Sequence, residues 1–223
     1  MIVIAKYDDM QNCNFCKAIL MLIIVLYHAG MFWTGNWFDV IQPIDKAPVI
    51  SIFVKWLATF HIYAFTLISG YVYYFVRYHR GGYDDKKRFI VNKFRRLIVP
   101  YIFICVLWVL PLSDVFFHFN AYTVVTKYVL GEAPSQLWFL LMLFGVFMIA
   151  YPLSDTFISH PVLSAFIVFG IWMAGIIGGT VFPNIFQIFT SLQYVLYFWI
   201  GFEIKRRESL SEDVKSLSIN KLK

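Results

Sequence analysis

Residues 14–33 read NFCKAILMLIIVLYHAGMFW, an apolar run with a lysine near its start and a histidine toward its end. A helix of twenty residues is about 30 Å long, which matches the hydrocarbon thickness of a bilayer. Lys17 and His28 lie about three helical turns apart, so they project from one face, roughly 16 Å from each other along the axis. An ionisable group in hydrocarbon costs at least about 2 to 3 kcal/mol, so it faces a cavity, a partner or a reaction. The run therefore predicts a membrane span with one functional face.

The composition excludes a water-soluble domain. The chain has 223 residues, of which 60% are hydrophobic and only 14% are charged, and this leaves too few polar residues to cover a folded surface. The net charge of +6 comes from basic residues beside the apolar runs. There they indicate membrane topology, so no nucleic-acid partner is predicted. We expect an all-α, polytopic transmembrane helix bundle in a lipid bilayer.

Apolar runs divide the sequence into six expected spans. They cover about residues 14–33, 50–76, 91–110, 137–153, 161–180 and 185–204. Pro152 and Pro161 are expected to flank the turn between the fourth and fifth spans, and Pro183 to precede the sixth. The mixed segment 111–136 is expected to form a helix lying in the membrane interface.

The basic residues also predict the orientation. If the N-terminus is cytoplasmic, 16 of the 19 Lys and Arg residues fall on the cytoplasmic side, and only Lys46, Lys55 and Lys127 do not. Both termini are therefore predicted to be cytoplasmic, with residues 1–204 forming the bundle and residues 205–223 a polar cytoplasmic tail. His28 then lies in the outer half of its span.

The three cysteines, Cys13, Cys16 and Cys105, are too few and too scattered for a disulfide framework. Cys13 and Cys16 form C-N-F-C, which we interpret as a pair of ordinary thiols at a helix entrance. No metal site is predicted.

Four short patterns occur in order along the chain. They are K-x10-H in the first span (Lys17, His28), FH-x3-F-x3-SGY in the second (Phe60, His61, Phe65, Ser69, Gly70, Tyr71), KFRRLIVPY at the third (Lys93, Arg95, Arg96, Pro100, Tyr101) and QLWFL at the fourth (Gln136, Trp138, Phe139). Together they resemble the acyltransferase-3 family of bacterial integral membrane acyltransferases. The resemblance covers nearly the whole chain.

The resemblance implies a multi-pass enzyme of the bacterial inner membrane. Such an enzyme moves an acyl group, usually acetyl, from cytoplasmic acyl-CoA to a hydroxyl of a cell-surface glycan, alongside polysaccharide-biosynthesis membrane proteins. Lys17 and His28 match the family's basic-x10-His pair, whereas Lys93 and Arg96 match its R-x-x-R element loosely. Tyr63 stands where the family usually has Pro.

Family members usually have more than six spans, so the chain resembles a C-terminally truncated member. Two alternatives follow for its function. One is a non-catalytic component of polysaccharide export, and the other is an inactive truncated fragment.

Physical chemistry assigns matching roles to these residues. The candidate catalytic residues are His28 and Lys17. A histidine is suited to take the proton of a hydroxyl near neutral pH, which makes His28 the candidate base, with Lys17 near the donor. Arginine and lysine bind phosphate through charge-assisted hydrogen bonds. The candidate acyl-CoA ligands are Lys93, Arg95, Arg96 and Arg88. The candidate acceptor ligands are Trp138 and Gln136, and the candidate supporting residues are His61 and Ser69.

Each role has a structural alternative. A histidine in a span also serves as a hydrogen-bond partner of a neighbouring helix, and Lys17 can extend to the headgroups. Basic loop residues follow from topology alone, and Trp138 is also typical of an interfacial anchor. The sequence leaves these alternatives open.

Overall fold

The computed structural model describes residues 2–34, 47–117, 120–132 and 134–220. Within this part of the chain every regular element is a helix. Six helices are long and apolar enough to cross a membrane: Gln11–Thr34, Pro48–His79, Lys86–Leu112, Trp138–Ser159, Pro161–Val181 and Ile185–Glu212. The predicted all-α bundle of six spans is confirmed, and the chain is a multi-pass membrane protein.

Most spans are built from several helical segments. The first comprises α1 (Ile2–Gly30) and the 3-10 turn η1 (Met31–Thr34), and the second comprises α2 (Pro48–Ala58), α3 (His61–Tyr74) and the π-helical η2 (Phe75–His79). The third region contains α4 (Lys86–Lys93), η3 (Phe94–Ile98), α5 (Val99–Ile104), η4 (Cys105–Val109) and α6 (Leu110–Phe117). The remaining elements are α7 (Ala121–Val124), η5 (Val125–Val129), η6 (Ser135–Leu137), α8 (Trp138–Ser159), α9 (Pro161–Val181), η7 (Ile185–Gln187) and α10 (Ile188–Asn220).

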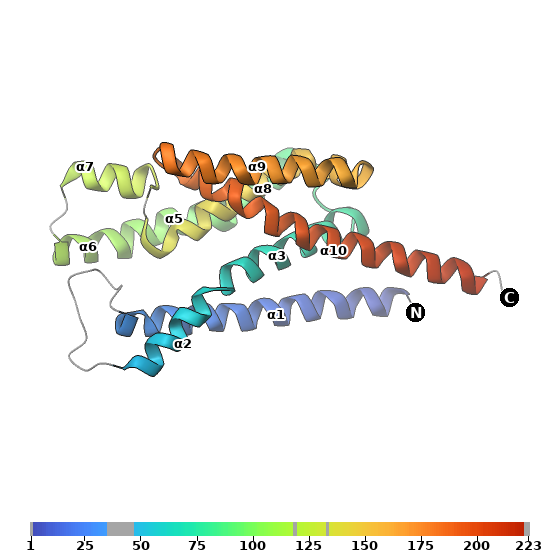
Figure 1. The fold of residues 1–223 in the computed structure, drawn as a ribbon, viewed down its shortest axis with the longest axis horizontal. Helices are drawn as coiled ribbons and strands as arrows, with labels where there is room; N and C mark the ends of the chain where they lie inside the picture. Colours follow the sequence, from blue (N-terminus) through green and yellow to red (C-terminus); the bar gives the residue numbers. More distant parts are fainter. Residues whose placement is uncertain (1, 35–46, 118–119, 133, 221–223) are drawn as a thin grey trace.

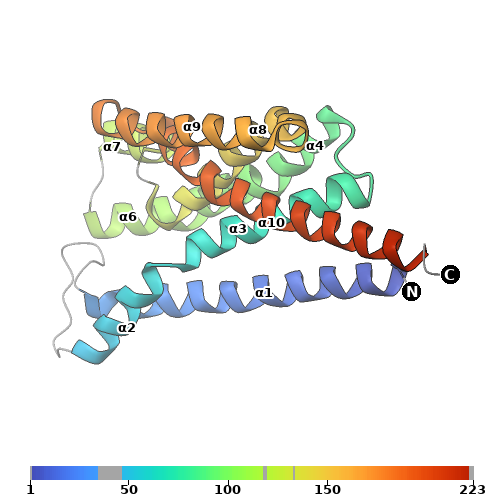
Figure 2. The same cartoon turned by 45° about the vertical axis from the view of Figure 1, so that its right-hand side comes forward.

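The long helix α10 is the centre of the bundle. It packs against α3, α8 and α9, and it crosses α3 obliquely in both views (Figures 1 and 2). Helix α1 lies on one side of the bundle, where it packs against α2 and α3. The start of α1 and the end of α10 lie at the same end of the molecule (Figure 1). Helix α10 continues through residue 204, so no break marks the predicted start of the tail.

The second span is broken between α2 and α3. Phe60 leaves helical geometry, with φ −135° and ψ −25°, and His61 begins the next helix. The last carbonyls of a helix lack intrahelical partners. The Leu57 carbonyl oxygen accepts a long bond of 3.4 Å from the Phe60 backbone N–H, and the Nδ1 atom of His61 lies closer to it, at 2.6 Å. The break therefore places an imidazole at the junction of the two helices.

The third span contains a wide π turn, η3, directly before α5. Pro100 has no N–H and would crowd the carbonyl four residues earlier in a regular helix, which is that of Arg96. The wider turn lets the helix continue past this proline. Both Arg95 and Arg96 lie within the π turn.

The expected turn at Pro152 is wrong. Pro152 lies inside α8, which continues to Ser159, and the connection to α9 is made at His160. Proline is tolerated inside membrane helices where neighbouring groups satisfy the freed backbone. The carbonyl that loses its helical donor is that of Met148. In the next turn the Ser154 hydroxyl donates to the Tyr151 carbonyl at 2.6 Å. Pro161 does begin α9, as expected.

The connection after the third span differs in part from the expected interfacial helix. Helix α6 prolongs the third span to Phe117, and α7 with η5 then forms the return segment. The end of this segment is fixed by Gln187, whose side-chain amide donates to the Gly131 carbonyl at 2.8 Å.

Two glycines set the close crossing of α3 and α10. A Cβ atom on Gly70 would overlap the Phe198 carbonyl, and one on Gly201 would overlap the Leu67 carbonyl. Small residues allow membrane helices to approach closely and gain van der Waals contact. The crossing therefore depends on the absence of side chains at these two positions.

Substituting Gly70→Ala should lower the free energy of unfolding by about 1 to 3 kcal/mol, because the added methyl forces two backbones apart. The matched control is Gly170→Ala on α9, where a Cβ meets nothing within 4 Å. Thermal unfolding in detergent micelles measures both. Equal midpoints for the two variants would contradict this account of the crossing.

Candidate functional site

A cluster of basic residues forms where α1 approaches the third span. Lys17 of α1 is half-buried, Lys93 at the end of α4 is buried, and Arg96 of η3 is exposed. The charges of these three residues interact with one another. They come from two spans, the first (Lys17) and the third (Lys93 and Arg96), and we call them the basic cluster. Three positive charges without a carboxylate among them favour an anionic ligand.

The Lys93 ammonium lies in an aromatic cage. Its nitrogen is 3.5 Å from the centroid of the Phe147 ring, 5.0 Å from that of Tyr83 and 5.5 Å from that of Phe89. Lys93 exposes 9% of its surface. In the described part of the chain, no carboxylate forms an ion pair with Lys93, whose ammonium has only the Tyr83 hydroxyl at 3.5 Å. The aromatic faces offset only part of the cost of burying this charge.

Tyr83 is held firmly in this cage. Its φ of 71° lies in the left-handed region, which costs a residue other than glycine about 1 kcal/mol or more. Its ring stacks on Tyr73 at 5.5 Å, and its carbonyl accepts a hydrogen bond of 3.1 Å from the Tyr151 hydroxyl. Burial raises the pKa of the Tyr83 phenol, although the charge of Arg96 opposes this in part. The phenol therefore stays protonated at neutral pH.

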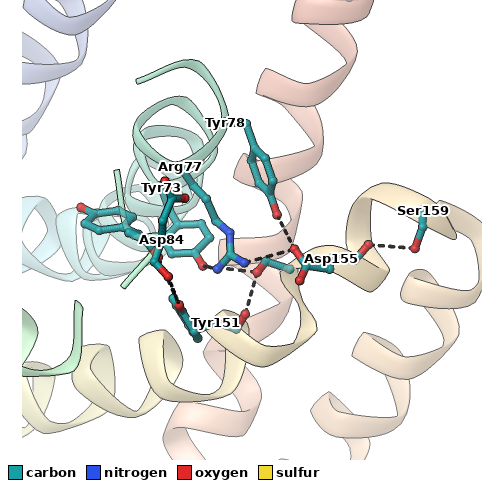
Figure 3. Close-up of polar contacts among 9 residues, drawn as sticks. Tyr73, Arg77, Tyr78, Asp84, Tyr151, Asp155 and Ser159 are labelled. Atoms are coloured by element: carbon teal, nitrogen blue, oxygen red, sulfur yellow. Dashed lines mark hydrogen bonds and ion pairs between the residues drawn. The ribbon is translucent and has the colours of Figure 1, made fainter. Parts of the chain in front are cut away.

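A polar network fixes the loop that carries Tyr83 (Figure 3). Arg77 of η2 points toward Asp155 of α8, with which it forms an ion pair of 3.1 Å, and it donates to the Tyr73 hydroxyl at 2.9 Å. The Tyr78 hydroxyl donates to Asp155 at 3.2 Å. The Arg77 guanidinium also lies 4.6 Å from the centroid of the Tyr151 ring. The second and fourth spans are thus joined beside the basic cluster.

About three turns after Lys17, His28 of α1 lies near His61 of α3. His28 is half-buried and close enough to His61 for their charges to interact. The Tyr27 ring packs against both imidazoles, with centroid distances of 5.0 Å to His28 and 4.7 Å to His61. A carbonyl can only accept, so the Nδ1 of His61 must donate to Leu57, and the Nε2 of neutral His61 carries a lone pair. We call His28 and His61 the histidine pair.

Of the four predicted acyl-CoA ligands, two join Lys17. Lys93 and Arg96 belong to the basic cluster, whereas no described contact brings Arg88 or Arg95 into it. Both of these arginines are exposed. Arg88 lines a separate cavity of about 490 Å³ beside the loop at 81–85. Their roles stay predictions.

The predicted acceptor ligands lie at the start of α8. Gln136 is exposed in η6, and Trp138 is half-buried, with its ring 6.0 Å from that of Tyr194. Tyr194 stacks on Tyr63 at 5.2 Å, and Tyr63 lies two residues after His61. An aromatic layer thus connects Trp138 to α3, the helix that carries His61 of the histidine pair.

Ser69 is engaged within its own helix. Its hydroxyl donates to the Phe65 carbonyl at 2.9 Å, and the side chain is buried beside the crossing at Gly70. This bond and its burial explain Ser69 as a packing residue of α3. Its supporting role in the candidate site stays a prediction.

Several residues of this site belong to none of the four sequence patterns, among them Tyr27, Tyr83 and Phe147. Tyr27 is adjacent to His28, which is a signal that could have been used. Tyr83 follows two glycines in a basic loop, which is a weaker signal. Phe147 is one of many phenylalanines in apolar spans, and nothing in the sequence distinguishes it.

The fold and these two groups define a multi-pass membrane protein with ionisable residues gathered inside the bundle. Residues 11–219 match the model of a family described as an acyltransferase domain. The chain belongs to this acyltransferase-3 family and is an acyltransferase. Comparisons with curated proteins and with solved structures give no significant match.

Replacing Lys93 with methionine should leave the free energy of unfolding unchanged or raise it, because a buried cation without a carboxylate partner is exchanged for an apolar side chain. Thermal unfolding of Lys93→Met in detergent measures this. Phe147→Leu should lower the free energy of unfolding by about 1 to 2 kcal/mol more when Lys93 is present than in the Lys93→Met background. Only when Lys93 is present does the change remove a contact between a cation and an aromatic ring. A large loss of stability in Lys93→Met alone would show that the ammonium is kept for structure.

Proposed function

We propose that this acyltransferase moves an acetyl group from acetyl-CoA, or a related acyl group from its own acyl-CoA, to a hydroxyl of a cell-surface glycan, in the bacterial inner membrane. One observation carries the proposal. Helix α1 bears Lys17, whose charge interacts with those of Lys93 and Arg96. Three turns farther along, the same helix bears His28, which lies near His61. These groups suit the two ends of an acyl-transfer reaction.

The basic cluster suits the phosphates of coenzyme A. Arginine and lysine form short, charge-assisted hydrogen bonds to phosphate oxygens. The excess of basic residues at this end of the bundle supports a cytoplasmic position, where acyl-CoA is available. An entering phosphate would also supply the negative charge that Lys93 lacks among the described residues.

The histidine pair suits the transfer step. A nitrogen of His28 takes the proton from the glycan hydroxyl, whose oxygen then forms a bond to the thioester carbonyl carbon. The carbon–sulfur bond breaks, and the thiolate of coenzyme A leaves and takes up the proton. His61 and Tyr27 orient the His28 ring through the contacts described above. Trp138 offers an aromatic face to the sugar, and Gln136 offers an amide.

The spacing of the two groups restricts the donor. Lys17 and His28 are separated by roughly 16 Å along α1. A donor with its phosphates at the basic cluster must therefore extend its acyl end about three helical turns into the bundle. This reach also brings the acyl group from the cytoplasmic half toward the outer half, where the glycan is expected.

The variant His28→Ala should abolish transfer of labelled acetyl from acetyl-CoA to glycan in membranes while the protein still inserts. The control is His160→Ala, at the exposed connection between α8 and α9, which should retain activity. Normal labelling by His28→Ala would refute its role as the base. A chain that supports export without acyl transfer would leave the labelling unchanged in every variant, including a deletion.

Replacing Arg96 with glutamine should raise the KM for acyl-CoA about tenfold or more with little change in kcat, because a charge-assisted contact to the donor is worth about 1.5 to 3 kcal/mol. Lys87→Gln, an exposed change in the same basic region, is the matched control and should leave the KM unchanged. Initial rates over a range of donor concentrations measure both. An unchanged KM in Arg96→Gln would exclude it as a donor ligand.

A further inference from the structure

A long apolar groove lies between the third span and helices α8 and α10. Its volume is about 740 Å³, and its walls include Phe94, Ile98 and Ile102 from the third span and Phe144 and Met148 from α8. The residues that line it include no member of the basic cluster or the histidine pair. The groove is therefore a feature separate from the candidate site.

The walls of the groove suit hydrocarbon. They are almost entirely apolar, and two of the hydroxyls that line them, those of Tyr101 and Ser191, are already donated within the protein. The Tyr101 hydroxyl donates to the Tyr128 carbonyl at 2.5 Å, and the Ser191 hydroxyl donates to the Gln187 carbonyl at 2.7 Å. A polar ligand would lose its own hydration without finding partners here.

The length of the groove suits an extended chain. On the third span it is lined from Phe94 to Leu110, which corresponds to about 24 Å along a helix. This exceeds half of the roughly 30 Å hydrocarbon thickness. Ile102 and Val106 are 50% and 53% exposed, so one wall is open toward the bilayer. A chain can therefore enter sideways from the membrane.

Positive charge lies at one end of the groove. Arg95 directly follows Phe94, which lines the groove, whereas Arg88 lines the cavity beside the loop at 81–85. Both side chains are exposed, and neither forms an ion pair with a described carboxylate. Long arginine side chains extend to the headgroup level, where lipid phosphates lie. The groove thus combines an apolar channel with a phosphate-binding end.

We infer that this groove binds an anionic phospholipid of the leaflet on the side of the basic loop. One acyl chain occupies the groove, and the phosphate is bound by Arg95. This site is independent of the acyl-transfer site and gives the exposed Arg95 a ligand of its own.

Native mass spectrometry of the detergent-purified full chain tests the site, with phosphatidylglycerol and phosphatidylcholine as probes. The chain should retain one phosphatidylglycerol preferentially, and Ile102→Trp should weaken its retention at least several-fold by filling the groove. The control is Phe103→Trp, which places the same side chain at an exposed position that does not line the groove and should retain the lipid.

Arg95→Gln provides a second variant that leaves the apolar walls intact. It should remove the preference for phosphatidylglycerol over phosphatidylcholine, with Lys87→Gln as its control. Equal retention in all variants would overturn the proposal. Displacement of the lipid by a long-chain acyl-CoA, with no phosphatidylglycerol preference, would also overturn it and would assign the groove to the donor.

Discussion

The cost of holding charge inside a membrane is the constraint on which this structure depends. Most of the buried charged groups near the end of the bundle where α10 terminates have a partner of opposite sign. Lys205 pairs with Glu208 at 3.1 Å, and Arg206 pairs with Glu203 at 2.7 Å. In both pairs the two residues lie three positions apart on α10, so each buried cation has a carboxylate beside it. Lys93 is the exception in the described part of the chain, since aromatic rings and other cations surround it.

The exception is informative because membrane proteins keep such groups mainly for function. A buried cation beside two others is costly in the unliganded protein and becomes favourable when an anion enters. The aromatic cage holds the ammonium in place until then, and the network of Arg77 and Asp155 holds the cage. The donor that we propose, acyl-CoA, carries several phosphates, so the arrangement of the cations fits the proposed reaction of this acyltransferase.

The helix α10 positions these groups although it contributes none of them. Its glycine-dependent crossing with α3 fixes the helix that begins at His61, and α3 in turn supports α1 with Lys17 and His28. Helix α8, which also packs against α10, carries Phe147 and Asp155. A change in the packing of α10 therefore reaches both the basic cluster and the histidine pair.

Much of the fold followed from the sequence, because six apolar runs of membrane length leave little choice of architecture. The face shared by Lys17 and His28 was also predictable, since it depends only on helical periodicity. The turn at Pro152 was not, because a bilayer tolerates an internal proline that would end a helix in water. The meeting of Lys93 with Phe147, and of His28 with His61, depends on how separate spans pack. Spacing along one chain does not contain that information.

The most direct test of the two-part site is to locate the acyl end of a bound donor. An acyl-CoA analogue with a photoreactive group on its acyl chain can be cross-linked in membranes, and the labelled peptide can be mapped by mass spectrometry. The account predicts cross-links within residues 20–34 and 57–66, around the histidine pair. Cross-links confined to the walls of the groove beside α8, or to the exposed loop at 80–88, would contradict it.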